Sequence, residues 1–326
     1  MLHHLRIATV ALLTATALFA PTRRAASDTP YFSTTVDELT VVANGSAKRC
    51  SRIAAQFVQF DTLMRDLAAW DPETRLPALK VFLISPREAD SVFLSDADRK
   101  RQDKTRMYIY SKYMPGTEFD IAAMLDEESY EEWMQSLFLL RAERLLIAGA
   151  ARRYPAWYQI GVANLLNGLV IKDDGTIIFN RYTAFLPQVD GSGGPRLKLD
   201  LRKLLALTRT NDLKSQSDWQ EFYKRARDWA TYGILTTPER KEHFRDLALL
   251  MRQGTPADEA VKAAFGVSLE ALSATFSQND WRKEVQFRRP PPSTRVVVPE
   301  SVRLSDGDAK LQLQIVAQRV AAAPPN

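Results

Sequence analysis

The feature that most constrains the fold is a helix, a short break and a second helix between residues 131 and 169. Apolar side chains of the first helix recur near the helical period, and they include Trp133, Leu137, Leu140, Leu146 and Ile147. Pro155 opens the second helix, where the missing N–H of proline has no cost. Two such helices in succession typically form the centre of a domain.

The start of the second helix carries a motif. The chain reads Tyr154-Pro155-Ala156-Trp157-Tyr158-Gln159-Ile160-Gly161-Val162-Ala163-Asn164. This resembles the segment Tyr-Pro-x-Trp-x-x-Glu-Gly-x-Ala-Glu of the gluzincin-type zinc metallopeptidases, in their bacterial peptidase-MA-like branch. The matching positions are Tyr154, Pro155, Trp157, Gly161 and Ala163. In that family the segment supplies the third zinc ligand, and the preceding helix carries HExxH.

The zinc ligands of the family are missing from this chain. Ile160 stands where the family has its ligand glutamate. By the family's usual spacing, HExxH falls on residues 139–143. Leu139 and Glu143 then replace the two histidines, and Leu140 replaces the catalytic glutamate.

A register shifted by one residue places the motif on residues 140–144. Arg141 and Arg144 would then face the site, and two cations would repel a metal. Neither register contains a histidine, because none occurs between His4 and His243. The resemblance therefore implies a degenerate metallopeptidase.

Histidine and cysteine counts restrict the chemistry further. Of three histidines, His3 and His4 belong to the N-terminal leader, so a two-histidine zinc site cannot form within one mature chain. His243 is expected on a solvated helix face. Cys50 is the only cysteine, which rules out an intrachain disulfide, and we expect it to be a small buried apolar residue. No cofactor and no catalytic residue are predicted.

The N-terminus resembles a secretory signal. A basic start precedes an apolar run from Ile7 to Ala20, and Ala15-Thr16-Ala17 offers a small-residue cleavage site. We expect a periplasmic or secreted protein, and an uncleaved N-terminal anchor would also fit. The formal net charge is +5, and three of these charges lie in the leader, which gives little reason to expect a nucleic-acid partner.

The order of elements predicts an α+β fold, in which a small mixed sheet packs on the two-helix core and a mainly helical C-terminal half follows. Strands are expected at residues 31–42, 79–84 and 107–110, and a hairpin at 170–179. The predicted organisation is a signal peptide (1–26), a degenerate metallopeptidase-like α+β domain (30–185), a helical C-terminal subdomain (196–287), and a proline-rich linker and tail (288–326). Within this tail, a strand and a short helix are expected at residues 296–320.

Two hypotheses describe the polar residues of the core. In one, Glu143 only pairs with Arg144, Arg152 or Arg153 near the surface. In the other, a remnant cleft persists, with Glu143, Trp157, Gln159 and Asn164 as candidates, although aromatic residues such as Trp157 more often belong to a core.

Leu139 and Leu140 should close the floor of that cleft by packing against the second helix near Trp157 and Ile160. Exposing each leucine to a polar cleft would forgo roughly 1.5–3 kcal/mol of burial.

The sequence thus predicts an exported, non-catalytic pseudopeptidase that binds a peptide, a protein or an envelope component. Two alternatives stay open. One is a hydrolase with a metal-independent site that no motif reveals, and the other is a structural protein that assembles partners. The oligomeric state is left open.

Overall fold

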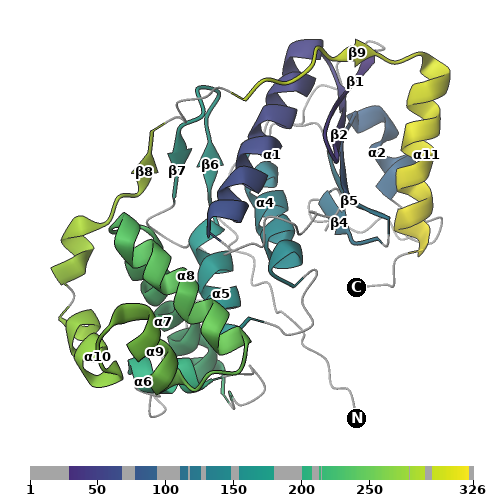
Figure 1. Ribbon diagram of the computed structural model, residues 1–326. Coiled ribbons are helices and arrows are strands. Elements are labelled where there is room, and N and C mark those ends of the chain that lie inside the picture. The colour runs from purple at the N-terminus through teal and green to yellow at the C-terminus, as the bar shows by residue number, and fades with distance from the viewer. Residues whose placement is uncertain are drawn as a thin grey trace, which may run out of the picture.

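The computed structural model shows an α+β protein with a mixed sheet at one end and a group of helices at the other (Figure 1). This confirms the predicted fold class, including the helical C-terminal half. The structure describes residues 29–67, 78–93, 111–116, 118–125, 130–147, 154–179, 200–207, 213, 215–278, 280–290 and 296–322. The predicted leader and the strand expected at residues 107–110 lie outside these ranges.

The main sheet has six strands in the order β4-β5-β3-β2-β1-β9. Its three inner strands β2, β3 and β5 are parallel, and the remaining pairings are antiparallel. In chain order the strands are β1 (Tyr31–Val36), β2 (Leu39–Asn44), β3 (Ala78–Ile84), β4 (Ser111–Met114), β5 (Phe119–Leu125) and β9 (Val302–Arg303).

Helices cover both faces of this sheet. Alternate residues of a strand point to opposite faces, so that Val81 and Leu83 of β3 join the core under α1 (Ala47–Leu67) and α4 (Tyr130–Ile147). Phe82 and Ile84 join a second core under α2 (Pro86–Phe93) and α11 (Asp306–Ala322). The inner strands therefore read as nearly continuous apolar runs, as strands buried on both faces do.

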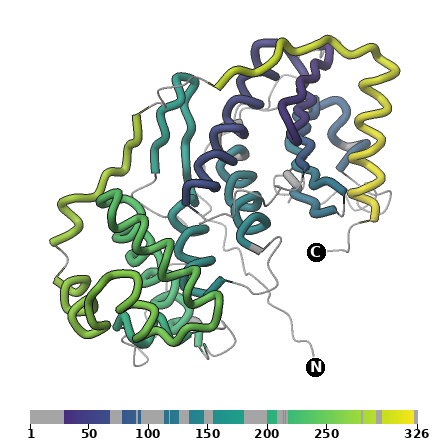
Figure 2. The backbone as a smooth tube through the Cα atoms, in the orientation of Figure 1, coloured from purple at the N-terminus to yellow at the C-terminus, as the bar shows by residue number. Residues whose placement is uncertain are grey.

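The C-terminal segment predicted as a linker and tail forms part of this architecture. Strand β9 pairs with β1, and α11 lies beside α2, so the end of the chain returns to the N-terminal sheet (Figure 2). Three side chains of α11 are buried there, namely Ala309, Leu313 and Val316. Composition alone indicated a linker because prolines precede the segment, but the apolar spacing of α11 supplies a buried face.

The helical half packs around α5 and α7. Its helices are α5 (Ala156–Leu166), α6 (Leu201–Ala206), α7 (Gln216–Ile234), α8 (Pro238–Arg252), α9 (Ala257–Phe265), α10 (Leu269–Ser277) and a 3-10 helix (Asp280–Glu284). A small sheet of β6 (Val170–Ile171), β7 (Ile177–Ile178) and β8 (Arg288–Arg289) flanks them. One apolar core runs without interruption from the main sheet into these helices.

Local signals explain most element ends. The Asp173-Asp174-Gly175 turn joins β6 to β7 as predicted, and Ser268 caps α10 by accepting a hydrogen bond from the Ala271 N–H. At α9 the N-cap position is occupied by Pro256, which provides no side-chain hydrogen bond. In the part of the chain that the structure describes, no helix is both long and apolar enough to cross a membrane.

Candidate functional site

Helix α4 is the element that would carry the catalytic motif of the resembled family. Its inward face consists of apolar side chains with Arg141 among them, and Arg141 is only 1% exposed. Its outward stripe includes Ser136, Leu140 and Glu143, spaced as neighbours on one face of a helix. The helix therefore buries a charged residue and exposes a leucine, the reverse of an ordinary amphipathic pattern.

Arg141 is held by an ion pair with α1. Its Nε lies 3.3 Å from Asp61 Oδ1, and its Nη2 lies 3.1 Å from Asp61 Oδ2, so the guanidinium donates two parallel hydrogen bonds. Such bidentate pairing is the strong form of an arginine–carboxylate contact. Burial alone would lower the pKa of Arg141, but the negative charge of Asp61 outweighs it and the pKa is raised. Arg141 is therefore a permanent cation inside the fold.

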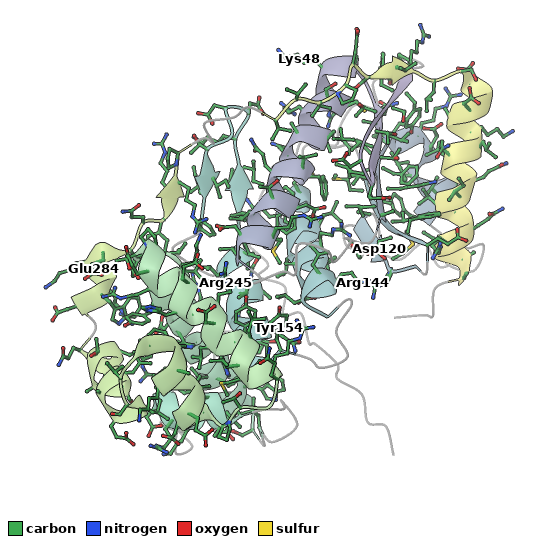
Figure 3. All side chains as sticks on the ribbon, viewed as in Figure 1. Lys48, Asp120, Arg144, Tyr154, Arg245 and Glu284 are labelled. Carbon is green, nitrogen blue, oxygen red and sulfur yellow. The ribbon has the colours of Figure 1, made fainter. Side chains whose placement is uncertain are left out.

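A second carboxylate, Asp120 of β5, completes the cluster and is 0% exposed. Its Oδ2 lies 3.5 Å from Arg141 Nη1 and 3.4 Å from Arg144 Nε. The Tyr113 hydroxyl donates to the same oxygen at 2.8 Å, and the Gly116 N–H donates to Oδ1 at 3.0 Å. Arg144 of α4 lies close to Asp120 of β5 (Figure 3). Each buried charge thus has partners, as a dehydrated ion requires.

The phenol of Tyr113 supports this arrangement as a donor. Burial raises its pKa, an effect that the nearby charge of Arg141 only partly offsets. The hydroxyl is therefore protonated at neutral pH and donates to Asp120, while its oxygen accepts from Arg141 Nη1 at 3.3 Å. We call Asp61, Tyr113, Asp120, Arg141 and Arg144 the ion cluster.

The two leucines of the degenerate motif are not placed as predicted. Leu139 is half-buried, and Leu140 is 37% exposed. The expectation that both would close a cleft floor is therefore wrong for Leu140. Arg141 takes the inward position instead. Its charge can be buried because it forms ion pairs with Asp61 and Asp120, and the apolar pattern of the sequence does not reveal these partners.

Glu143 lies on the outward stripe with Leu140. Although the residue is exposed, the surrounding protein removes enough water from its carboxyl to raise the pKa. Its charge acts on Tyr223 of α7 and raises the pKa of that phenol, which burial raises more strongly. The predicted pair with Arg144 does not form, since Arg144 binds Asp120. Arg152 and Arg153 lie outside the described residues.

Glu143 lies one turn from Leu140 on α4, and its charge reaches Tyr223 of α7. Tyr223 is 37% exposed, and its ring centroid lies 5.7 Å from that of the half-buried Trp219. We call Leu140, Glu143, Trp219 and Tyr223 the α4–α7 surface. It combines two aromatic rings, a leucine and a carboxylate.

Helix α5 shows what the matching motif residues do in this fold. Trp157 is 0% exposed and packs edge-on against Trp229 and Phe244, at centroid distances of 6.4 and 5.4 Å. Gly161 allows close contact with α7, because a Cβ at this position would lie 2.4 Å from the carbonyl oxygen of Ala226. The motif therefore builds the interface between α5 and α7, and Trp157 belongs to the core.

The remaining cleft candidates lie on α5. Gln159 is half-buried, and its Nε2 donates to the Tyr154 carbonyl at 2.6 Å. Ile160 packs against the main core. Asn164 is half-buried on the face that packs against α7, and its Nδ2 has no hydrogen-bond partner among the described residues. Of the four predicted cleft residues, only Glu143 is exposed.

These residues do not fit a zinc ion. A leucine and an isoleucine cannot bind zinc, and Glu143 is the one ionisable group at a family ligand position in the favoured register. In the described ranges, no group of three or more His, Cys, Asp or Glu side chains is arranged to hold a metal. His243 is half-buried on α8 against the Phe265 ring, and Cys50 is buried in α1.

Comparison with known proteins does not assign this chain to a family. The sequence matches no protein-family model and none of the curated proteins with which it was compared. The resemblance to gluzincins consequently rests on the motif residues of α5 alone.

Sequence reasoning missed the ion cluster. It aligned Arg141 with the segment that carries HExxH in the resembled family. It did not predict that Arg141 would contact Asp61, Tyr113 and Asp120. The available signal was charged residues inside two apolar segments, Asp120 in FDIAAML and Arg141, Glu143 and Arg144 in LFLLRAERLLI. Two buried charges of opposite sign in such segments usually pair.

Proposed function

We propose that this protein is an exported, non-catalytic pseudopeptidase that binds a peptide or protein segment on the α4–α7 surface. An envelope component that presents such a segment would bind in the same way. The resemblance of α5 to the gluzincin segment supports a common architecture, and the missing ligands argue against zinc hydrolysis.

The observation that carries this proposal is the burial of Arg141 between Asp61 and Asp120. Zinc hydrolysis needs three protein ligands, an open position for water and a general base. Here the polar side chains on the inward face of α4 are committed to ion pairs. Among its described residues, α4 leaves Ser136, Leu140 and Glu143 exposed, and these can contact a ligand without changing it chemically.

A cleavage assay tests the non-catalytic part. The purified full chain is incubated with casein and a mixed peptide library, with and without added zinc, and the products are identified by mass spectrometry. We expect no cleavage above buffer in either condition, and elemental analysis should find no stoichiometric zinc. Turnover that co-purifies with the protein would favour a hydrolase, and about one tightly held zinc per chain would refute the loss of the metal site.

A binding assay tests the surface itself. Immobilised decapeptides of apolar, basic and acidic composition are probed with the wild type and with Leu140→Ser. We expect the substitution to weaken binding about fivefold or more, since it removes a partly buried apolar contact. The matched control is Leu311→Ser, which changes a leucine of α11 that is also exposed. Absence of binding to every peptide class would refute the proposal.

A further inference from the structure

Two cationic side chains contact one aromatic ring at one end of the main sheet. The Nζ of Lys80 in β3 lies 4.3 Å from the centroid of the Phe119 ring, and the guanidinium carbon of Arg319 in α11 lies 5.4 Å from the same centroid. Phe119 begins β5, which pairs with β3, and α11 packs on this face of the sheet (Figure 1). The tertiary structure therefore brings together two positive charges that are far apart in the sequence.

The turn between β4 and β5 fixes the position of the Arg319 guanidinium. Its Nη1 donates a hydrogen bond to the Pro115 carbonyl at 3.4 Å, and a Cβ built on Gly116 would lie 2.6 Å from the same nitrogen. An arginine carries five N–H donors, and the Pro115 carbonyl is the one acceptor that Arg319 has among the described residues. The side chain is therefore held in place while most of its donors remain available to a ligand.

The charges of Lys80 and Arg319 are not balanced by an acid within the described ranges. Asp120, the residue after Phe119, points to the opposite face of the sheet and binds Arg141 and Arg144 there. Many surface cations of a protein lack an ion pair, but here two of them meet at one ring. The ring attracts each cation without cancelling the repulsion between them. An anion beside both cations would remove that repulsion.

We propose that Lys80 and Arg319 bind a phosphate group beside the Phe119 ring. A phosphate group with one ester bond or none carries between one and two negative charges at neutral pH, which matches two cations better than the single charge of a carboxylate does. The planar fork of an arginine binds two phosphate oxygens at once, and a lysine binds phosphate as a point charge. This site does not depend on the α4–α7 surface.

Calorimetric titration of the full chain tests the ligand class. Inorganic phosphate, glycerol phosphate and acetate are titrated separately in a phosphate-free buffer of low ionic strength. We expect both phosphates to bind with a Kd of about 1 mM or lower, and acetate to bind at least about tenfold more weakly. Equal Kd values for the two phosphates would support free phosphate as the ligand, and tighter binding of glycerol phosphate would support a phosphate ester.

Substitutions locate the site. Lys80→Gln and Arg319→Gln should each weaken phosphate binding about tenfold, since each removes one of the two charges. The matched control is Lys310→Gln, which removes an exposed charge from α11 and should leave the Kd unchanged. If Arg319→Gln does not fold, Arg319→Lys replaces it. This variant keeps the charge but loses the planar fork, and it should bind phosphate more weakly than the wild type does.

Thermal melting gives a second measurement. Phosphate should raise the melting temperature of the wild type, because a ligand that binds the folded state stabilises it. The double variant Lys80→Gln with Arg319→Gln should melt at the same temperature with and without phosphate. No phosphate binding by the wild type, acetate binding as tight as that of phosphate, or an equal loss of binding in Lys310→Gln would each overturn the inference.

Discussion

Helices α4 and α5 are adjacent in sequence and both are largely buried, but different interactions stabilise them. The inward face of α4 contains Arg141, whose charge is balanced by Asp61 and Asp120. The inward face of α5 contains Trp157 and Gly161, which contact α7 closely. Ion pairs depend on every partner being present, whereas close apolar packing depends on volume. The two helices should therefore respond differently to substitution.

The largest expected effect is that of Arg141→Ala. It leaves Asp61 and Asp120 without their shared cation, and the free energy of unfolding should fall by about 3–5 kcal/mol. Guanidinium denaturation measures this loss. The control is Arg202→Ala, because Arg202 pairs with Asp258 and Glu270 on the surface and its removal should leave the midpoint unchanged within error.

A double variant sharpens the interpretation. Arg141→Met with Asp61→Leu removes both members of the buried pair and fills their volume, while Asp120 keeps Arg144 and Tyr113. It should be about 1–3 kcal/mol more stable than Arg141→Ala, since replacing a buried pair costs less than breaking it. If the double variant is less stable than the single one, charge compensation is not what stabilises α4.

A smaller loss is expected for Gly161→Ala in α5. The added methyl would overlap the Ala226 carbonyl at 2.4 Å, so the helices must separate, and the loss should be about 1–3 kcal/mol. The melting temperature should fall accordingly. Gly307→Ala in α11 is the matched control, because a Cβ there would meet Ser305 Oγ at 3.9 Å, an ordinary contact, and alanine favours a helix. Equal effects of the two substitutions would contradict the close approach of α5 and α7.

The smallest effect concerns the outward stripe of α4. The raised pKa of Glu143 means that the folded state binds its proton more tightly than the unfolded chain. The free energy of unfolding contributed by this group therefore falls as pH rises from about 4.3, the ordinary glutamate pKa, through the folded pKa.

Glu143→Gln should consequently be slightly more stable than the wild type at pH 7 and equal to it below pH ~4. Thermal melting between pH 3.5 and 8 would show the difference appear with rising pH. A difference that is constant with pH, or a less stable variant at pH 7, would mean that the Glu143 charge is not disfavoured in the fold.

Local sequence signals predicted the secondary-structure elements whose formation depends on residues nearby in the sequence. The helix after Pro155 and the hairpin at residues 170–179 follow from periodicity and turn chemistry. Strand β5 was missed because its two alanines and Asp120 lower its strand propensity, and tertiary packing decides its conformation.

The candidate site was predictable only in part. The motif residues of α5 located the two central helices, and Glu143 was identified as a surface residue of interest. The orientation of α4 depends on Asp61, Tyr113 and Asp120, which lie 80, 28 and 21 positions from Arg141 along the chain. No local sequence pattern reveals partners so far away along the chain. Leu140 was therefore assigned to the interior, and no ion-pair partner was predicted for Arg141.

The pairing of the first strand with the last affects how the chain folds during synthesis. Thr34 of β1 donates a hydrogen bond to the carbonyl of Pro299, which is 265 positions away. Until α11 has been made, the sheet face that carries Phe82 and Ile84 lacks one of its two helical covers. A nascent chain in which α11 has not yet been made therefore displays part of this apolar surface. Exposed apolar surface of this kind promotes aggregation during folding.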